Sequence, residues 1–290
     1  MELDDGEVGM ARKTHPAVAI DPNTGWPTDA VADPIGPLTL VTADTQSRLW
    51  QYVRGPRSSV RDQARAFLRR DDFAPVHEMP RTEHRERIRQ QLAALAGTDL
   101  IAIGFPAKVG GQGDAAAFVT FFEELSYGDV SLQVKVGVHF GLFGGAVQHL
   151  GTERHWEQYL PGVIDFSLPG CFAMTETGHG SDVQSIGTTA TYDVARGEFD
   201  LHTPDRTAWK DYIGNAASHA RVAVVFAQLV TPALPNGAEG TEGTATLNHG
   251  VHAFVVPLRG TTGEVLSGIK IEDNGHKLGL NGVDNGRISF

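Results

Sequence analysis

The sequence predicts an α+β protein in which a helical N-terminal half is followed by a half built of strands. Before about residue 170, apolar residues recur at helical spacing and follow Ser, Thr and Asp residues suited to helix N-caps. After that point, short runs of β-branched residues are separated by Gly, Pro and Asn turns. A chain of 290 residues with 41% hydrophobic content is long enough for one large or two modest domains with a real core.

The composition argues against several classes of function. The net charge of −11 disfavours nucleic acid as a partner, because phosphate binding requires a basic surface. The single cysteine, Cys171, excludes an internal disulfide framework and fits a reducing compartment such as the cytoplasm. No run of about eighteen apolar residues predicts a membrane span, and the acidic N-terminus lacks the apolar core of a signal peptide. The histidines form no cluster with metal-ligand spacing, so we expect no metal site.

Residues 1–41 contain five prolines and no sustained periodicity, which predicts an irregular arm. Three helices are expected to follow this arm. The third carries Ile88, Leu92 and Leu95 at helical spacing, an apolar stripe that predicts a buried face. The expected starts and ends of these helices are Asp44 or Thr45 to Tyr52, Ser58 or Ser59 to Arg70, and Thr82 to Gly97.

A glycine-rich loop at residues 104–113 comes next. It does not have the pattern of a phosphate-binding loop, because no Lys-Ser/Thr pair follows its glycines. Asp114 is then placed to cap a helix that runs through Leu125.

Residues 129–150 are ambiguous between helix and strand. The alternating apolar residues at positions 132, 134, 136 and 138 are typical of a strand, whereas Asp129 or Ser131 could cap a buried helix that ends at Leu150. Gly151 and Thr152 then stop this element and cap a helix over 153–160, which we expect the Pro161-Gly162 pair to close.

Seven extended runs are expected in the second half of the chain. Two of them, 222–227 and 251–256, are largely apolar and predict buried strands. The segment between them, 231–248, is rich in Gly, Thr and Pro and predicts a mobile surface hairpin extension. The others are expected at 171–174, 188–193, 198–202, 268–272 and 284–290.

The candidate site begins in the stretch 171–183, where an extended apolar run gives way to a loop of small residues. Gly178 and Gly180 let the backbone approach a ligand, and Thr175 and Ser181 offer hydroxyl groups. Free backbone N–H groups and hydroxyls suit a flat ligand rich in acceptors, such as a flavin ring. By itself the pattern is equally compatible with an ordinary exit from a strand.

A second stretch, 210–216, reads K-D-Y-I-G-N-A. Together with the T-E-x-G-x-G-S-D loop at 175–182, this strand resembles the middle region of the acyl-CoA dehydrogenase and oxidase superfamily of FAD enzymes. His179 and the run 188–193 look most like the acyl-CoA oxidase branch. The resemblance extends from about residue 44 to the last residue.

This resemblance implies a helical domain over 42–169 and an antiparallel β-domain over 170–290, with FAD held against the β-domain. It also implies a buried helix over 129–150 and a place near the ligand site for the loop at 104–113. Members of the family continue with a C-terminal helical region that supplies the catalytic glutamate and subunit contacts. That region is not in this sequence, so we assign no catalytic residue here and expect this chain alone not to desaturate acyl-CoA. The complete protein is expected to be a homo-oligomer.

The resemblance also carries the family's flavin-binding role onto individual residues. Phe172 and Met174 would contribute backbone contacts, Thr175 would bond to the edge of the isoalloxazine ring, and Ser181 would contact the flavin pyrophosphate or the acyl-CoA. Many members have Trp at the position of Tyr212, and Ser or Thr at that of Gly214, so one hydroxyl bond is expected to be missing. The full expected set is Phe172, Ala173, Met174, Thr175, Glu176, Thr177, Gly178, His179, Gly180, Ser181, Tyr212, Ile213 and Gly214.

The implied reaction is the α,β-desaturation of an acyl-CoA thioester to trans-2-enoyl-CoA in fatty acid β-oxidation, with electrons passed to O2. Two alternatives remain open. One is a dehydrogenase that passes electrons to an electron-transfer flavoprotein, and the other is a truncated module that binds acyl-CoA or flavin without turnover. In a eukaryote, an oxidase of this type would be peroxisomal rather than cytoplasmic.

Overall fold

The computed structural model describes residues 42–76, 78–233 and 246–290, so the predicted arm at 1–41 and most of the predicted hairpin extension lie outside the described residues. The chain divides into two compact units, residues 1–56 and 57–290, which we describe separately. The described part of the first unit is helix α1 (Ala43–Arg54). Thr42 caps it, with its hydroxyl accepting the Thr45 N–H at 3.2 Å. The predicted caps, Asp44 and Thr45, were wrong because the extended backbone at Thr42 already turns that hydroxyl toward the first turn.

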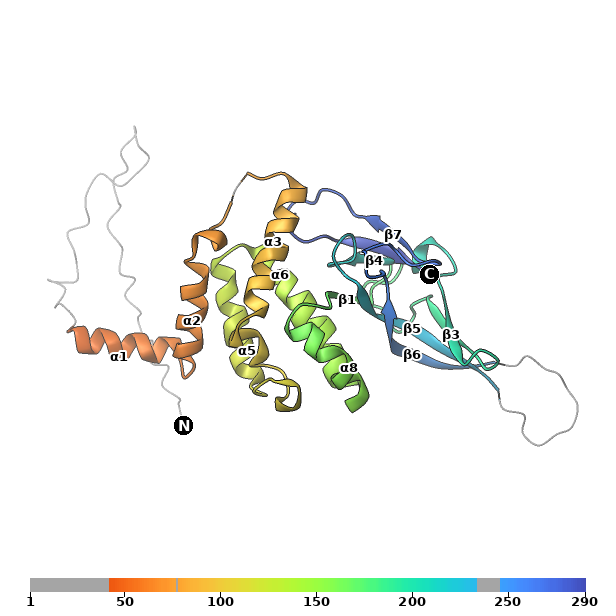
Figure 1. The fold of residues 1–290 in the computed structure, drawn as a ribbon, viewed down its shortest axis with the longest axis horizontal. Coiled ribbons are helices and arrows are strands. Elements are labelled where there is room, and N and C mark those ends of the chain that lie inside the picture. The colour runs from red at the N-terminus through yellow and green to blue at the C-terminus, as the bar shows by residue number, and fades with distance from the viewer. Residues whose placement is uncertain (1–41, 77, 234–245) are drawn as a thin grey trace, which may run out of the picture. The chain divides into compact units, whose positions relative to one another are not determined.

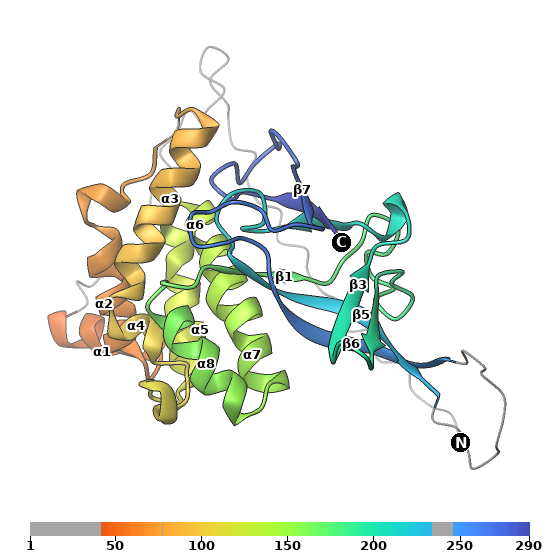
Figure 2. The same ribbon diagram turned by 45° about the vertical axis from the view of Figure 1, so that its right-hand side comes forward.

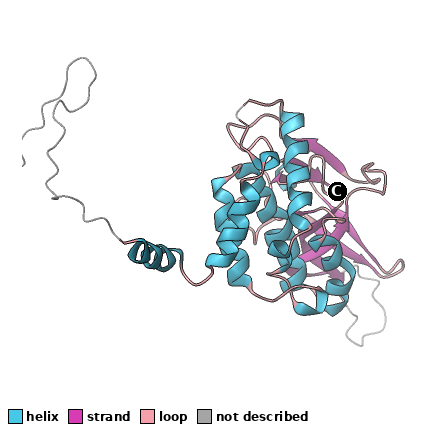
Figure 3. Ribbon diagram, turned by 60° about the vertical axis from the view of Figure 1, so that its left-hand side comes forward, coloured by secondary structure: helices cyan, strands magenta, loops and turns pink. Residues whose placement is uncertain are grey.

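The second unit places its helices on one side and its strands on the other (Figure 3). All of its described α-helices precede residue 165 and all of its described strands follow residue 169, which confirms the predicted order of a helical half and a strand half. The α-helices are α2 (Ser58–Leu68), α3 (Arg81–Ala96), α4 (Asp99–Ala102), α5 (Ala115–Glu124), α6 (Val130–Val136), α7 (Gly145–Leu150) and α8 (Glu153–Ile164).

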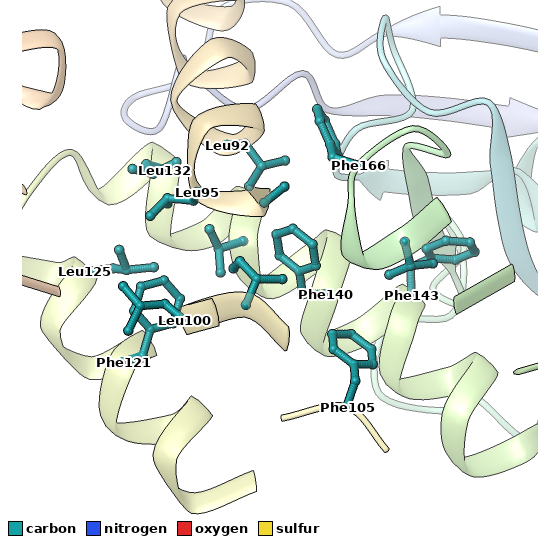
Figure 4. Packing of buried hydrophobic residues seen from close by; sticks show 14 of the residues in the cluster. Leu92, Leu95, Leu100, Phe105, Phe121, Leu125, Leu132, Phe140, Phe143 and Phe166 are labelled. Atoms are coloured by element: carbon teal, nitrogen blue, oxygen red, sulfur yellow. The ribbon is translucent and has the colours of Figure 1, made fainter. Parts of the chain in front are cut away.

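The predicted stripe of α3 forms the centre of the helical core. Ile88, Leu92 and Leu95 are all fully buried, and Figure 4 shows the two leucines beside side chains from α5 and α6. The predicted cap Thr82 was wrong, because Pro80, with φ fixed at −53°, leads directly into the helix. The predicted serine caps of α2 were also wrong, since that helix starts at Ser58 itself without a side-chain cap.

Helix, not strand, is correct for residues 129–150. Asp129 caps α6 by accepting the Ser131 N–H at 2.8 Å, and a π-helical segment, η4 (Gly137–Gly144), joins α6 to α7. The buried apolar residues fall at helical spacing and override the alternation seen in the sequence. They are Leu132, Val136, Phe140, Phe143 and Val147.

By length and composition, the helical stretch Val130–Leu150 is apolar enough to cross a membrane, with a mean hydropathy of 1.3. However, it lies in the middle of the unit, and 56% of its apolar segment is buried within the fold. It also carries two fully buried polar side chains, Lys135 and His139, both hydrogen-bonded to the surrounding chain. We therefore interpret it as a core helix.

His139 joins three elements at the centre of the fold. Its Nδ1 accepts the N–H of Gly170 at 3.1 Å, and its Nε2 lies 3.0 Å from the carbonyl oxygen of Val163. Because an N–H donates to Nδ1, Nε2 carries the proton and the ring is neutral. Burial lowers the pKa of His139 from 6.5 to about 4.

Helix α8 runs further than predicted. Thr152 is the N-cap as predicted, and its N–H donates to His155 Nδ1 at 3.1 Å. Pro161 was expected to close the helix but lies inside it, and the helix continues to Ile164. The proline removes one backbone hydrogen bond, and the fully buried side chain of Val163 holds the last turn against the core.

The strands form two sheets, and the first is mixed rather than antiparallel. Strands β1 and β2 both run parallel to β5, whereas the pairs β2–β3 and β5–β6 are antiparallel. The second sheet has the order β4-β8-β7 and is antiparallel. The strands are β1 (Gly170–Ala173), β2 (Thr189–Asp193), β3 (Glu198–His202), β4 (Lys210–Ile213), β5 (Val222–Pro232), β6 (Thr246–Pro257), β7 (Lys270–Asp273) and β8 (Gly286–Ser289).

The parallel pairs arise because β1 and β2 lie end to end along one edge of β5. Strand β1 pairs with residues 222–225 and β2 with residues 228–230. The chain between them, 174–188, forms a loop that leaves the edge of β5 and returns to it further along. Strands β1 and β2 therefore run in the same direction. Figure 2 shows β1 passing from the helices toward the sheet. Strand β6 was predicted to be buried, but it lies on the other edge of β5 with its residues half-buried or exposed.

Alternate residues of β1 and β5 face two different cores. One set packs against the helices and includes Phe172, Val222, Val224 and Phe226. The other set faces the second sheet and consists of small residues. Those small residues are Cys171, Ala173, Ala223 and Val225. The sheet therefore contacts the helices and the second sheet at once (Figure 1).

Gly170 has no room for a side chain. A Cβ placed on it would lie 2.2 Å from ring atoms of Phe143. We expect Gly170→Ala to lower the free energy of unfolding by about 1–3 kcal/mol through overpacking. Gly145→Ala is the control, because a Cβ there meets nothing within 4 Å and should stabilise the helix slightly. Urea unfolding of both variants tests this, and equal midpoints would contradict the packing at Gly170.

The depressed pKa of His139 predicts a loss of stability in mild acid. The unfolded chain binds this proton below pH 6.5 and the folded chain only below about pH 4, so stability falls as the pH drops through that window. The total loss from this group is roughly 3 kcal/mol. His139→Gln should be less stable than the unaltered protein at neutral pH but lose less stability between pH 6.5 and 4. Parallel curves from urea unfolding at several pH values would contradict this.

Candidate functional site

The loop of residues 174–188 is closed at its base by one buried carboxylate. Glu176 accepts the backbone N–H groups of Gly187 at 2.7 Å and Thr188 at 3.0 Å, and the Thr188 hydroxyl at 2.6 Å. Its fourth partner is the ammonium of Lys210 on β4, 2.9 Å away. Both ends of the loop and the second sheet therefore meet at a single side chain.

The Glu176–Lys210 pair is an ion pair sealed from solvent, with both side chains 0% exposed. Burial raises the pKa of Glu176, but the hydrogen bonds from Lys210, Thr188 and the Gly187 N–H outweigh it and hold the pKa below its usual range. Lys210 also donates to the carbonyl oxygen of Met174 at 3.1 Å. The carboxylate stays ionised at neutral pH and acts as an anchor for the loop.

Asp211, the next residue on β4, forms a second junction. Its carboxylate accepts the Thr177 hydroxyl at 3.0 Å, the Asn274 amide at 2.9 Å and the Arg287 guanidinium at 3.0 Å. Burial raises the pKa of Asp211, but these donors and the Tyr212 N–H lower it further than burial raises it. The loop, β4 and the β7–β8 region are thus fixed to one another.

Tyr212 is held in an unusual conformation beside this junction. Its φ is +56°, which is strained for a residue with a side chain. The residue is 67% exposed. Asp211 accepts its N–H at 2.8 Å, and Asn285 donates to its carbonyl oxygen at 2.8 Å. The surrounding hydrogen bonds therefore stabilise an exposed aromatic ring, which is an arrangement suited to stacking on a ligand.

The tip of the loop presents free donors. Gly178 lies close to Thr207, where a Cβ would come within 3.0 Å, and its N–H bonds to the Thr207 carbonyl at 2.7 Å. Within the residues that the structure describes, the N–H groups of Gly180 and Ser181 and the Ser181 hydroxyl make no hydrogen bond. A Cβ on Gly180 would meet nothing within 4 Å, so the space above these donors is open. Such a set suits an anionic or acceptor-rich ligand.

Thr175 lies between the loop and β4. Its hydroxyl donates to the Asp211 carbonyl at 3.1 Å, and its own carbonyl accepts the Asp211 N–H at 3.0 Å. The hydroxyl proton is therefore used within the chain, while the oxygen can still accept a hydrogen bond from a ligand. His179 lies near the loop tip. Its backbone N–H donates to the Glu176 carbonyl oxygen, and its own carbonyl oxygen accepts the Glu176 N–H.

The other expected flavin-binding residues have their side chains in the cores. Phe172 packs on Phe226 with ring centroids 4.9 Å apart, and Ile213 lies in the core between the sheets. Gly214 is buried beneath helix η4, where a Cβ would come within 2.9 Å of Val138. The Ser or Thr usual at that position therefore has no room here unless Val138 moves. Met174, which is partly buried, is also packed on the helical core, and Ala173 is buried against the second sheet.

Lys210 and Asp211 hold the site together, and this role was not predicted from the sequence. A signal was present, since Lys210 and Asp211 are two adjacent charged residues at the start of an expected strand, and a charge that becomes buried requires a partner. The partner of Lys210, Glu176, was assigned to flavin binding instead. In the structure all of its side-chain contacts are within the chain.

The loop at 104–113 borders an apolar pocket of 350 Å³. The pocket lies between this loop, α5 and the π-helical segment, and its lining includes Phe105, Phe118 and Phe140. The same π-helical segment contacts β1 through His139 and Phe143. The loop that was expected near the ligand site therefore borders this pocket, next to the π-helical segment that contacts β1.

Two family models match the chain, the acyl-CoA dehydrogenase N-terminal domain over residues 57–167 and its middle domain over residues 171–290. The chain belongs to the acyl-CoA dehydrogenase and oxidase superfamily. It is 39% identical over 241 residues to the peroxisomal acyl-coenzyme A oxidase 2 of Arabidopsis thaliana, an alignment that covers 82% of this chain and 33% of that protein. It is 49% identical over 162 residues to the peroxisomal acyl-coenzyme A oxidase 3 of the same plant, covering 56% of this chain and 22% of that protein.

Solved structures of acyl-CoA oxidases share the fold. Acyl-CoA oxidase 1 from Yarrowia lipolytica superimposes with a TM-score of 0.66 and 28% identity, over 80% of this chain and 31% of that one. Acyl-CoA oxidase-1 of Caenorhabditis elegans, solved as a complex with FAD and ATP, gives a TM-score of 0.60 and 29% identity, over 81% of this chain and 33% of that one. The present chain therefore spans a third or less of the length of these relatives.

Breaking the buried pair at the base of the loop should be strongly destabilising. Lys210→Met leaves the Glu176 carboxylate buried without its cation, which we expect to cost about 3–5 kcal/mol of stability. The control is Lys108→Met, since the Lys108 ammonium forms an exposed pair with Glu153 at 2.6 Å and should change stability little. Urea unfolding measures both, and similar losses would show that the Glu176–Lys210 pair does not hold the loop.

Proposed function

We propose that this chain is part of an FAD-dependent acyl-CoA oxidase that converts an acyl-CoA thioester to trans-2-enoyl-CoA in fatty acid β-oxidation. The observation that carries the proposal is the loop tip at 180–181, where free N–H and hydroxyl donors lie on a loop that is locked to the strand bearing the exposed ring of Tyr212. The relatives named above are acyl-CoA oxidases, which supports O2 as the electron acceptor. Those two relatives are peroxisomal by name, so we propose the same location if the organism is a eukaryote.

The residues present fit FAD. The unpartnered donors of Gly180 and Ser181 suit phosphate oxygens or the acyl-CoA, and the oxygen of Thr175 can accept a bond at the ring edge. Tyr212 offers an aromatic face, and the backbone of 172–174 and 213–214 would border the ring. Bound FAD would supply the acceptor for the hydride that leaves the β-carbon of the substrate.

The chain's own residues would position the cofactor and exclude water rather than remove the α-proton. A general base needs a carboxylate that is free to reach the substrate. In the described part of the chain, the fully buried carboxylates all have partners. Glu124 is paired with Arg61 and Arg65, and Glu176 and Asp284 are paired with buried lysines. We therefore propose that the base of the complete enzyme is not among these groups.

Two other functions would use the same site. A dehydrogenase would pass the electrons to an electron-transfer flavoprotein, and a non-catalytic module would bind acyl-CoA or flavin without turnover. The decisive experiment has two stages. The purified chain is first titrated with FAD while flavin fluorescence and visible absorbance are recorded, and saturable binding with a shifted spectrum is expected. No binding would contradict the proposal that these residues hold flavin.

The second stage mixes a flavin-loaded protein that includes the family's C-terminal helical region with a saturated acyl-CoA. We expect the flavin absorbance to bleach without O2 and to recover with formation of hydrogen peroxide when O2 is added. Bleaching without reoxidation by O2 would favour the dehydrogenase, and no bleaching would favour the binding module. The same mixing experiment with residues 1–290 alone is expected to give no bleaching at a comparable rate, because we propose that the base lies in the family's C-terminal helical region.

Thr175→Ala tests the flavin edge. The substitution removes an oxygen that can accept a ligand bond and the 3.1 Å bond to the Asp211 carbonyl. We expect FAD binding to weaken by the equivalent of about 1–3 kcal/mol, the cost of leaving a buried polar ligand atom unpaired. Thr120→Ala is the control, since the Thr120 hydroxyl only bonds to the Ala116 carbonyl of its own helix at 2.9 Å. Equal FAD affinities for Thr175→Ala and the unaltered chain would remove Thr175 from the site.

A further inference from the structure

A second lysine, Lys135, is sealed inside the protein where helix α6 meets the strands. Its side chain is 0% exposed, and its ammonium has three polar neighbours from the other half of the unit. It donates to Asp284 Oδ1 at 2.6 Å and to Asn215 Oδ1 at 2.6 Å, and it lies 2.9 Å from His219 Nδ1. Two hydrogen bonds of this ammonium are therefore directed at the turn after β4 and the segment before β8, and His219 Nδ1 lies beside both Lys135 and Asp284 Oδ1.

Asp284 balances this charge and shapes the same turn. Its side chain is also 0% exposed, and its Oδ2 accepts the N–H groups of Ser218 at 2.9 Å and His219 at 3.0 Å. Burial raises the pKa of Asp284, but Lys135 and His219 lower it well below its usual range. Burial lowers the pKa of Lys135, and the charge of Asp284 opposes that change. Asp284 is therefore ionised and holds the backbone at 218–219, while Lys135 holds Asn215.

Asn215 connects this charge network to the candidate flavin site. It follows Gly214 directly and has a left-handed backbone with φ of +68°. Its Oδ1 is held by Lys135, so its amide nitrogen is oriented to donate to the carbonyl oxygen of Gly170, at 3.0 Å. Gly170 begins β1, the strand that leads into the loop at 174–188. One amide group therefore fixes β4 and β1 at a set distance from each other.

The same helix touches the site a second time. Val138, one turn after Lys135, lies against Gly214, so packing and charge act together on the end of β4. The opposite side of Gly170 is occupied by Phe143 and by His139, which accepts its N–H. The position of β1 relative to β4 is thereby determined by the central helix, without any contact between Lys135 and the exposed loop tip.

We propose that Lys135 is a positioning residue for flavin binding, which acts through Asn215 to align the two strands that border the cofactor. This inference rests on the proposed function, because it assigns Lys135 a role in holding the ligand named there. Lys135 itself touches neither cofactor nor substrate in this assignment. Its ammonium orients the Asn215 amide, and that amide holds Tyr212–Gly214 beside the strand that carries Phe172–Thr175.

The test compares variants that keep and lose this alignment. Lys135→Met removes the ammonium and leaves Asp284 buried without its cation. This variant is compared only under conditions where circular dichroism shows that it is folded. The double variant Lys135→Met, Asp284→Asn removes both charges and keeps an oxygen for the N–H groups of Ser218 and His219. Both are titrated with FAD as full 290-residue chains, with flavin fluorescence and the shape of the visible spectrum as readouts.

We expect both variants to bind FAD roughly tenfold or more weakly than the unaltered chain, with a spectrum closer to that of free flavin. Asn215→Ala should reproduce this loss, and its effect should not add to that of Lys135→Met, since both break one connection. Two controls separate positioning from stability. Lys108→Met alters an exposed lysine that pairs with Glu153, and Leu92→Ala destabilises the helical core without touching the network.

The outcomes are distinct. No FAD binding by the unaltered chain overturns the proposed function and the role of Lys135 with it. FAD binding by the unaltered chain with equal affinity and an equal spectrum in the folded double variant overturns only the role of Lys135. An equal loss of affinity in Leu92→Ala, at a temperature where it is folded, would show that the effect follows from stability and would also overturn that role.

Discussion

The candidate site depends on two lysine–carboxylate pairs that are sealed from water. Glu176 and Lys210 close the loop at 174–188, and Lys135 and Asp284 fix the turn after β4. Each pair joins segments that are far apart in the chain, and each carboxylate also accepts backbone N–H groups. A buried ion pair is a weak source of net stability, because desolvation offsets most of the attraction. It is strongly specific, however, since any shift of the segments would leave a buried charge without its partner.

The sequence was sufficient for the order of the fold and for most of its elements. The stripe of Ile88, Leu92 and Leu95, the Asp114 cap and the strand predicted at 188–193 were correct because each is determined by local chemistry, namely helical periodicity, a capping carboxylate, and β-branched composition. The two family motifs led to a loop and a strand that the structure joins by hydrogen bonds. What these motifs indicated was the location of the site, rather than the contacts that build it.

The predictions were wrong where contacts between residues far apart in the sequence determine the structure. The parallel pairing of β1 and β2 with β5 could not be predicted, because both strands share one edge of β5 only after the loop between them is closed by Glu176 and Lys210. Pro161 remains in α8 because Val163 is held by the core, and β6 is half-exposed because no further strand covers its outer edge in the described part of the chain. Lys135 looked like an ordinary helix residue, and its partner is 149 positions away.

The placement of β1 and β2 along a single strand separates the architecture of the sheet from the length of its loop. Glu176 ties the two ends of the chain between Ala173 and Thr189 to each other by bonding to Gly187 and Thr188, so the residues beyond this closure lie outside the hydrogen bonds of β5. Residues can be inserted or lost near the tip without shifting the register of any strand. Evolution can therefore remodel the ligand-facing surface by changing loop length and composition while the scaffold that carries it stays unchanged.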